Sequence, residues 1–246
     1  VRSRGLGDVY KRQRHTFNAL FFVVALGAVR GSVPAISKIV ILGGIDPILY
    51  SASISLFGGL LLVLVNFVLG WTTPVTKQVV WFSLIGGVVG ITIPHIIFFN
   101  GIKSVDVGIA SAMISGVPII IYVLSLTFKQ ETFLIRRFMG VLMGLIGVVL
   151  IASAGITEEA MITASLVGIA LILLSTFFYA SNVVFISVYL PSNLSRMQAA
   201  AWMMIFGSLP IWLFILIGHD FSLIYSTTQN SAFIFLLLHG FVSGLA

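Results

Sequence analysis

Long apolar runs, each about as long as a membrane-crossing helix, are separated along the chain by short polar segments. The runs are continuously apolar rather than alternating, and they exceed the roughly 9–11 residues of a transmembrane β-strand. A transmembrane helix needs about 20 such residues. The pattern therefore predicts an all-α polytopic membrane protein with helices at 17–42, 47–70, 79–101, 108–128, 138–155, 163–190, 197–217 and from 231 onward.

The two ends of the sequence differ from what lies between them. Residues 1–13, VRSRGLGDVYKRQ, contain neither a methionine nor an apolar stretch, so we expect a non-native tail rather than a signal peptide. The last apolar run, from Ser231 to Ala246, is shorter than the roughly 20 residues that a span requires. We therefore expect a fragment that lacks C-terminal helices.

The composition agrees with a membrane protein and disfavours other classes. Hydrophobic residues make up 59% of the 246 and charged residues 8%, against about 25% charged in soluble domains, and the mean hydropathy is +1.16. Without cysteine the chain forms no disulfide, cysteine-ligated zinc site or thiol nucleophile. It has no P-loop, zinc-ligand spacing, nucleophile elbow or paired catalytic carboxylates, so we expect no cofactor and no metal.

The charged residues divide unequally between the two sides of the predicted bundle. Cytoplasmic loops of membrane proteins carry an excess of lysine and arginine. On the side of the N-terminus, leaving out residues 1–13, lie Arg14, Lys77, Lys129, Arg136, Arg137 and Arg196. On the other side lie Lys38 and Lys103, with the acidic Asp46, Asp106, Glu158, Glu159 and Asp220. We expect a multi-pass protein of the inner membrane with its N-terminus in the cytoplasm. Because the basic residues lie in short loops, the net charge of +6 does not indicate nucleic-acid binding.

An internal repeat is visible at an offset of 149 residues. It lays SASISLFGGLLLVLV (51–65) on AAWMMIFGSLPIWLF (200–214), and the first span on the sixth without a gap. Matching pairs are Ala52 and Ala201, Phe57 and Phe206, Gly58 and Gly207, Leu60 and Leu209, and Leu64 and Leu213. A unit of five helices is odd, so the second copy must insert upside down. Such inverted repeats are typical of secondary transporters, whose substrate site lies near the membrane midplane between the halves. We expect repeats at 14–155 and, incomplete, at 163–246.

Three stretches resemble the EamA branch of the drug/metabolite transporter superfamily. RGSVPAISK (30–38) resembles the WGSNFVAIK signature of that family's first helix. DPILYSASISLFGGLLL (46–62) is similar to the opening of its second helix, and VDVGIASAMISGVPIIIYVLSLTFKQE (105–131) to its fourth. The resemblance implies ten helices with both termini cytoplasmic, of which about eight are present here. The chain departs from the family pattern at Arg30, where tryptophan is usual, and at Ile54, where arginine is frequent.

Arg30 and Lys38 place positive charges in the first span. Arg30 lies near its midpoint, where an arginine costs about 2.5–3.5 kcal/mol on insertion scales, and no Asp or Glu lies within any predicted span. Its partner could be a residue of a missing helix, a backbone carbonyl freed by Pro34, or an anionic or zwitterionic substrate. Lys38 matches the family lysine and could bind substrate, or it could reach the outer interface.

Four further polar residues are candidate substrate contacts. His95 follows Pro94 in the third span and could relay protons, bind substrate, or bond a carbonyl loosened by the proline. His239 is a similar, weaker candidate in the eighth span. Tyr179 and Asn182 lie on the sixth span, where Tyr179 aligns with Arg30 in the repeat. Asn182 could instead form an interhelical hydrogen bond worth about 0.6 kcal/mol.

Prolines and glycines indicate where helices bend or approach one another. The candidate helix breaks or hinges are Pro34, Pro94, Pro118 and Pro210, in the first, third, fourth and seventh spans. Gly140 and Gly144 form a GxxxG motif, and Gly108, Ala112 and Gly116 show the same spacing. Small residues at this spacing typically let two helices pack closely.

These observations favour a secondary transporter that exports small organic metabolites, such as amino acids or related compounds, by alternating access. The missing ATP motif argues against a pump. The alternative is an integral membrane enzyme acting on a lipid-linked substrate, but the acidic pair Glu158 and Glu159 has no histidine beside it. A channel is a third alternative, disfavoured by the inverted repeat. The expected partners are a small-molecule substrate and the lipid bilayer; a homodimer stays open.

Overall fold

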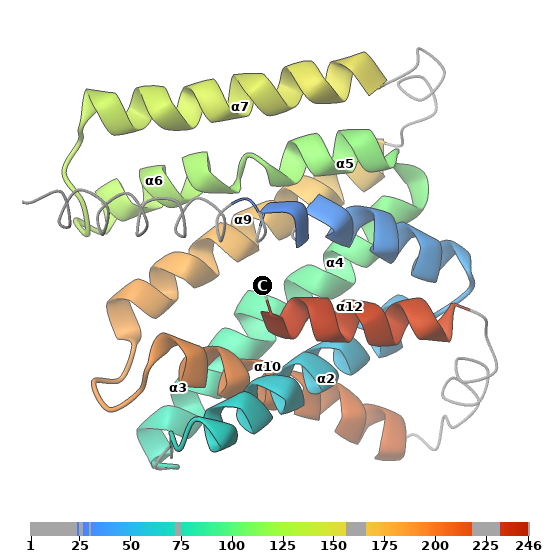
Figure 1. Cartoon of the computed structure of the whole chain (residues 1–246), viewed down its shortest axis with the longest axis vertical. Coiled ribbons are helices and arrows are strands. Elements are labelled where there is room, and N and C mark those ends of the chain that lie inside the picture. The colour runs from blue at the N-terminus through green and yellow to red at the C-terminus, as the bar shows by residue number, and fades with distance from the viewer. Residues whose placement is uncertain are drawn as a thin grey trace, which may run out of the picture.

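The computed structural model describes Val24, residues 27–29, 31–71, 75–155, 166–217 and 232–245, and these residues form helices and connecting turns without a strand among them (Figure 1). The predicted all-α architecture is confirmed. Five helical spans in the described part are long and apolar enough to cross a membrane, namely Pro47–Val68, Lys77–Ser104, Val107–Thr127, Leu166–Tyr189 and Arg196–Ile217.

Where a helix boundary lies among the described residues, it is within about three residues of the one predicted from the apolar runs. The described part of the first helix covers residues 31–42. It is followed by α2 (Pro47–Val68), α3 (Lys77–Gly87), the π-helical η1 (Val88–Thr92), α4 (Ile93–Gly101), the 3₁₀-helical η2 (Ile102–Ser104), α5 (Val107–Ile114), α6 (Val117–Thr127), α7 (Ile135–Gly155), α9 (Leu166–Tyr189), α10 (Arg196–Ile217) and α12 (Phe233–Leu245). The third predicted span is therefore continuous from α3 to η2, and the fourth is divided into α5 and α6.

Short polar side chains begin several of these helices. The carboxylate of Asp46 accepts hydrogen bonds from the backbone N–H groups of Ile48 and Leu49, at 2.8 and 3.2 Å, with Pro47 at the first helical position. Asp106 caps α5 in the same way. At the start of α10, Ser195 and Gln198 bond to each other's backbone N–H groups, at 2.9 and 3.2 Å.

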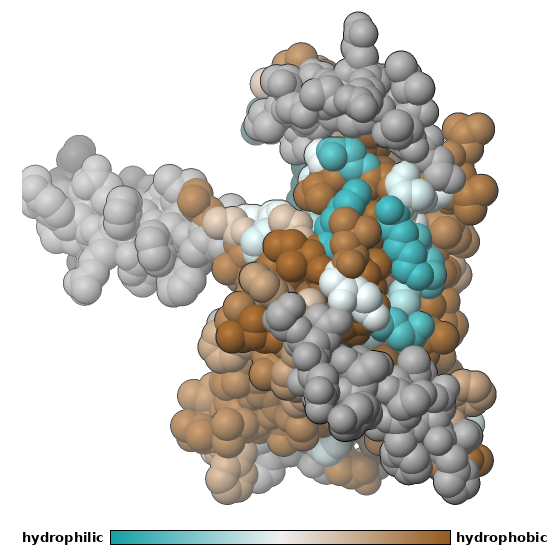
Figure 2. All heavy atoms as spheres, turned by 90° about the vertical axis from the view of Figure 1, so that its right-hand side faces the viewer, coloured by the Kyte–Doolittle hydropathy of each residue, from teal (hydrophilic) through white to brown (hydrophobic). Residues whose placement is uncertain are grey.

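Charged residues gather at two opposite ends of the bundle. At the left-hand end in Figure 1, α3 begins with Lys77, α10 begins with Arg196, and the segment that joins α6 to α7 carries Lys129. The caps Asp46 and Asp106 lie at the opposite end. Figure 2 looks onto that end, where hydrophilic surface gathers near the middle and hydrophobic surface lies to both sides of it. The described charges at these helix starts, which the sequence assigned to different sides, thus lie at different ends.

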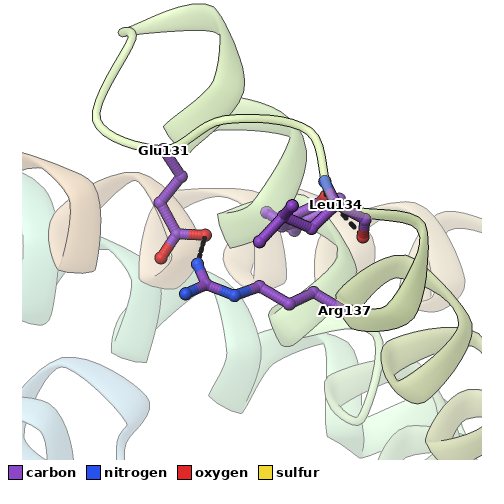
Figure 3. Close-up of polar contacts among 4 residues, drawn as sticks. Glu131, Leu134 and Arg137 are labelled. Carbon is purple, nitrogen blue, oxygen red and sulfur yellow. Dashed lines mark hydrogen bonds and ion pairs between the residues drawn. The ribbon is translucent and has the colours of Figure 1, made fainter.

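The segment between α6 and α7 is held by a tyrosine and an ion pair (Figure 3). The hydroxyl of Tyr122 accepts from the Leu134 N–H at 2.9 Å and donates to the Leu134 carbonyl at 3.3 Å. Arg137 Nη1 lies 2.7 Å from Glu131 Oε2, with both side chains exposed. Because exposed pairs contribute only about 0–1 kcal/mol, the tyrosine contact is the firmer one.

Two glycines of the bundle lie in close contact with neighbouring helices. A Cβ at Gly58 of α2 would lie 2.5 Å from Cε of Met204 of α10, and 2.8 and 3.2 Å from Oγ of Ser243 and the carbonyl oxygen of Gly240 of α12. A Cβ at Gly207 of α10 would lie 2.6 Å from the carbonyl carbon of Gly87 of α3. Gly58 and Gly207 are a matching pair of the 149-residue offset. Each of these two glycines thus lies against helices of the other predicted repeat, although their partners Gly240 and Gly87 are not a matching pair at that offset.

Helix α7 does not show the close packing expected from its GxxxG motif. A Cβ added to Gly140 or Gly144 would meet no atom within 4 Å among the described residues. The helix instead lies beside α5 and α6 at the edge of the bundle (Figure 1). The motif therefore faces away from the other described helices.

Candidate functional site

Aromatic and imidazole rings from different helices meet in the interior of the bundle. On α4, His95 stacks on Phe99 one helical turn later, with ring centroids 5.5 Å apart and planes 12° apart. Phe99 contacts Tyr50 of α2 at 4.3 Å, and His95 contacts Tyr179 of α9 edge-on at 5.7 Å. Side chains of three separate membrane spans thus form one continuous set of ring contacts.

His239 of α12 adds a fourth helix. Its Nδ1 shares a hydrogen bond with the hydroxyl of Tyr50, and the two rings meet edge-on at 5.5 Å. Its ring also lies 6.4 Å from that of Phe99. Tyr50 and Phe99 are fully buried, and His239 is 2% exposed. We call His239, Tyr50, Phe99, His95 and Tyr179 the ring row.

Two members of the ring row belong to the larger of two apolar clusters of the described bundle. Tyr50 and Phe99 belong to that cluster, together with residues of the first helix, α9 and α12, including Val40, Ile172 and Leu236. Transferring a polar group into such surroundings is unfavourable unless it finds a hydrogen-bond partner. The bond between Tyr50 and His239 meets that requirement for both side chains.

A π-helical turn directly precedes the histidine on α4. In η1 the N–H of Ile93 bonds to the carbonyl of Val88, five residues earlier, and Pro94 follows. Proline has no N–H, so it cannot supply the bond that a regular α-helix would make to the carbonyl of Gly90. The hydroxyl of Ser51 on α2 donates to the carbonyl of Thr92 at 3.1 Å. Such π-turns occur often at functional sites.

Asn182 lies one turn along α9 from Tyr179 and packs on this π-turn. A Cβ at Gly90 would lie 2.1 Å from Oδ1 of Asn182, so only glycine leaves room for the amide. That Oδ1 is buried and has no hydrogen-bond partner among the described residues. A pocket of about 200 Å³ lies beside it, lined by Ile85, Gly86, Val89, Gly90, Phe178, Ser181, Asn182 and Phe185. A buried acceptor of this kind suits a water or ligand donor.

The two predicted cationic contacts have different outcomes. The ammonium group of Lys38 donates to the carbonyl of Val105 at 2.5 Å, where η2 leads into α5. The structure thus gives Lys38 a backbone partner near the end of the bundle that carries Asp106. Arg30 lies outside the described residues, and its role stays a prediction.

The four prolines have different surroundings. Pro34 is buried within the first helix, which is regular over its described part. Pro94 follows the π-turn, and Pro118 begins α6 after the turn at Gly116 that separates it from α5. Pro210 lies inside α10, which is continuous from Arg196 to Ile217, so the break expected in the seventh span is not observed. Hinge motion at any of them stays a prediction.

Sequence reasoning missed three residues of the site. Tyr50 lies one turn after the cap Asp46, where a tyrosine at a membrane interface is common. Phe99 is one of 20 phenylalanines. Gly90 has a recognisable signal in its spacing from Pro94. A proline four residues later leaves the Gly90 carbonyl without its helical donor. Among the described residues, no group of three or more His, Asp or Glu could hold a metal ion.

The fold defines a multi-pass membrane protein with polar rings inside the bundle. The family model of the EamA-like transporter family matches residues 17–153, which is more than half of the chain. The chain belongs to this family. An uncharacterized transporter of Archaeoglobus fulgidus is 29% identical over 149 residues, which cover 57% of this chain and 50% of the relative. The chain therefore spans about half the length of this curated relative. No solved structure matches.

Proposed function

We propose that the protein is a secondary transporter that exports small organic metabolites, amino acids or related compounds, from the cytoplasm by alternating access. The ring row carries the proposal. It places two imidazoles and two phenols in the bundle interior, and it draws them from both predicted repeats, His95 and Tyr50 from the first and Tyr179 and His239 from the second. Transporters with inverted repeats bind their substrate at such an interface.

The chemistry beside the ring row favours a zwitterionic solute. The unpartnered Oδ1 of Asn182 can accept a hydrogen bond from an ammonium group, and the hydroxyl of Tyr179 can donate or accept. Arg30, which aligns with Tyr179 in the repeat, supplies a guanidinium that pairs well with a carboxylate. An amino acid carries both of these charges on neighbouring carbon atoms.

The packing of α2 and α10 supports alternating access. Gly58 and Gly207 match in the predicted repeat, and a Cβ at either position would overlap a helix of the other predicted repeat. Related packing lets the two halves exchange conformations, as inverted repeats do in other transporters. The basic end of the bundle is then the cytoplasmic end. The protein lies in the inner membrane with its N-terminus on the cytoplasmic side.

We propose a transport role and no catalytic one. A membrane enzyme for a lipid-linked substrate would need an acid or histidine cluster near a membrane face. Of the histidines of the ring row, His239 is instead buried and His95 half-buried among the described helices, and Asp46 and Asp106 serve as helix caps. Their arrangement suits recognition rather than acid–base chemistry on a lipid headgroup.

Solute counterflow tests the function directly. The full-length protein is reconstituted into liposomes loaded with one unlabelled amino acid, and entry of the same radiolabelled amino acid is followed for each of a panel. We expect transient accumulation for at least one amino acid. Asn182→Ala should reduce it at least about tenfold, because a buried hydrogen bond to a charged group contributes about 1.5–3 kcal/mol.

The matched control is Phe177→Leu, a substitution on the same helix at a side chain that is 48% exposed and outside the pocket. It should transport like the wild type. The proposal is wrong if no amino acid shows counterflow, or if Asn182→Ala and Phe177→Leu transport equally well.

A further inference from the structure

His239 lies next to the glycine at which α12 approaches α2. In α12 the residue before Gly240 is His239, which bonds to Tyr50. Where α10 crosses α3, the residue before Gly87 is Gly86, whose Cβ would meet the side chain of Met203. The second contact is apolar, so close packing of two helices does not by itself require an imidazole and a phenol. Since polar groups are costly to bury, the pair at His239 requires another explanation.

The bond between Tyr50 and His239 suits both charge states of the imidazole. A phenol hydroxyl can donate to Nδ1 of a neutral imidazole, and the same oxygen can accept from the Nδ1–H of an imidazolium. Adding a proton at Nδ1 therefore needs only a rotation of the hydroxyl hydrogen, with the ring positions unchanged. A partner that can only donate, such as a backbone N–H, would oppose protonation.

A second imidazole contacts the same aromatic ring. His95 stacks on Phe99, which also contacts His239 and Tyr50. The face of an aromatic ring attracts a cation, so Phe99 can stabilise an imidazolium at His95. Two imidazolium ions around one phenylalanine would repel each other strongly in surroundings of low dielectric constant. The pair therefore suits one proton rather than two.

The charged and titratable groups around the pair have other partners or lie further along the helices. From α2, the Asp46 carboxylate caps its own helix, and from the first helix the Lys38 ammonium binds the Val105 carbonyl. From α9, Tyr179 contacts His95. Arg30 lies outside the described residues. If the solute carries a carboxylate, it adds a negative charge next to the proton held by His95 and His239.

We propose that His95 and His239 form a proton-binding site that holds one proton between them, and that this proton couples to solute movement. The proton site stands on the geometry of the rings. The coupling rests on the proposed transport function. Tyr50 positions the proton on His239, and Phe99 contacts both imidazoles.

Nitrogen chemical shifts of isotope-labelled histidine test the site without any solute, because they distinguish neutral and charged imidazoles. The full-length protein in lipid nanodiscs is titrated between about pH 5 and about pH 9, the range in which histidine normally changes charge. His95→Asn and His239→Asn assign the two signals among the four histidines of the chain. We expect the pair to gain one proton in the wild type, and the remaining histidine to gain a full proton in each single variant.

Tyr50→Phe is the second variant, because it keeps the ring that packs on Phe99 and removes only the hydroxyl. It should move the proton from His239 to His95. If His239→Asn fails to insert into the membrane, the histidine nitrogen chemical shifts of Tyr50→Phe still test the proton site. Gain of two independent protons, no titration of either histidine, or an unchanged distribution in Tyr50→Phe would each overturn the proton site.

Counterflow of a transported amino acid over the same pH range tests the coupling. The rate should depend on pH in the wild type and lose that dependence in the double variant His95→Asn with His239→Asn. A single shared proton together with pH-independent counterflow would overturn the coupling. Absence of counterflow at every pH would contradict the proposed function, whereas the shift titration would still decide whether the proton site exists.

Discussion

Gly90 is the most sensitive position for a test of the contact between the π-turn and α9. The methyl group introduced by Gly90→Ala would lie 2.1 Å from Oδ1, 2.2 Å from Cγ and 2.7 Å from Cβ of Asn182. Rotating the amide removes the first two overlaps. The third involves the base of the side chain, so α9 must also move away from η1. The substitution should therefore displace the amide from the pocket and loosen the packing of the two helices.

The expected loss of stability follows from two opposing terms. Inserting a methylene-sized group into a packed interior costs about 1–3 kcal/mol. Replacing glycine by alanine within a helix contributes about 0.8–1.0 kcal/mol in the opposite direction. Gly140→Ala is the matched control, because its methyl group meets no described atom within 4 Å and only the favourable term applies. The two variants should therefore differ by about 1–3 kcal/mol in the free energy of unfolding, Gly90→Ala being the less stable.

Unfolding in mixed micelles with increasing SDS, followed by circular dichroism, measures this difference. Adding Asn182→Gly to Gly90→Ala removes all three overlaps, so it should recover stability without recovering transport. Recovery of both would show that the amide matters only for packing. Equal stability of Gly90→Ala and Gly140→Ala would refute the contact itself.

Three further predictions use the same protein. Gly207→Ala should destabilise it more than Gly144→Ala in the same unfolding assay, because the first methyl group meets the backbone of another helix and the second meets no described atom; equal stability would contradict the crossing. Because the chain has no cysteine, each single-cysteine variant can be labelled alone in intact cells that express it. An impermeant thiol reagent should label Lys103→Cys and not Gln78→Cys, and the opposite pattern would reverse the orientation. Arg30→Gln should abolish counterflow of a carboxylate-bearing solute while insertion persists, and Arg30→Lys should keep part of it, since the charge remains without the bidentate fork; a wild-type rate in Arg30→Gln would show that the arginine does not bind the solute.

Much of the fold could be predicted because lipid imposes strong rules on a chain. A backbone inside a membrane must satisfy its own hydrogen bonds, so each long apolar run becomes a helix whose length matches the bilayer. The helix α2, predicted at 47–70 and observed at Pro47–Val68, shows how closely this holds. The π-turn at Val88–Thr92 could not be predicted, because a run that is apolar on every face has no periodicity to reveal one extra residue.

The candidate site was predictable only through residues that are rare in membrane spans. His95 and Tyr179 stood out because polar side chains are costly inside a membrane, and the structure brings them into contact. Their neighbours Tyr50 and Phe99 carried no such signal. Which rings meet depends on how each helix is rotated and where it crosses the next, and neither is encoded in the local pattern of a uniformly apolar segment. For Lys38 the structure shows a backbone partner that sequence spacing could not identify.

Under the proposed function, a transporter of small metabolites needs halves that pack in related ways and a lining that is unequal. Exchange between two access states is easiest when the halves pack similarly, and Gly58 and Gly207, which match in the predicted repeat, each lie against helices of the other predicted repeat. An amino acid has no two-fold symmetry, so its ammonium and carboxylate groups need different partners from the two halves. The imidazole of His239, where α12 approaches α2, and Gly86, where α3 crosses α10, are an unequal lining of this kind. Substitutions at the crossings should therefore act mainly on the rate of exchange, and substitutions in the ring row mainly on the affinity for solute and proton.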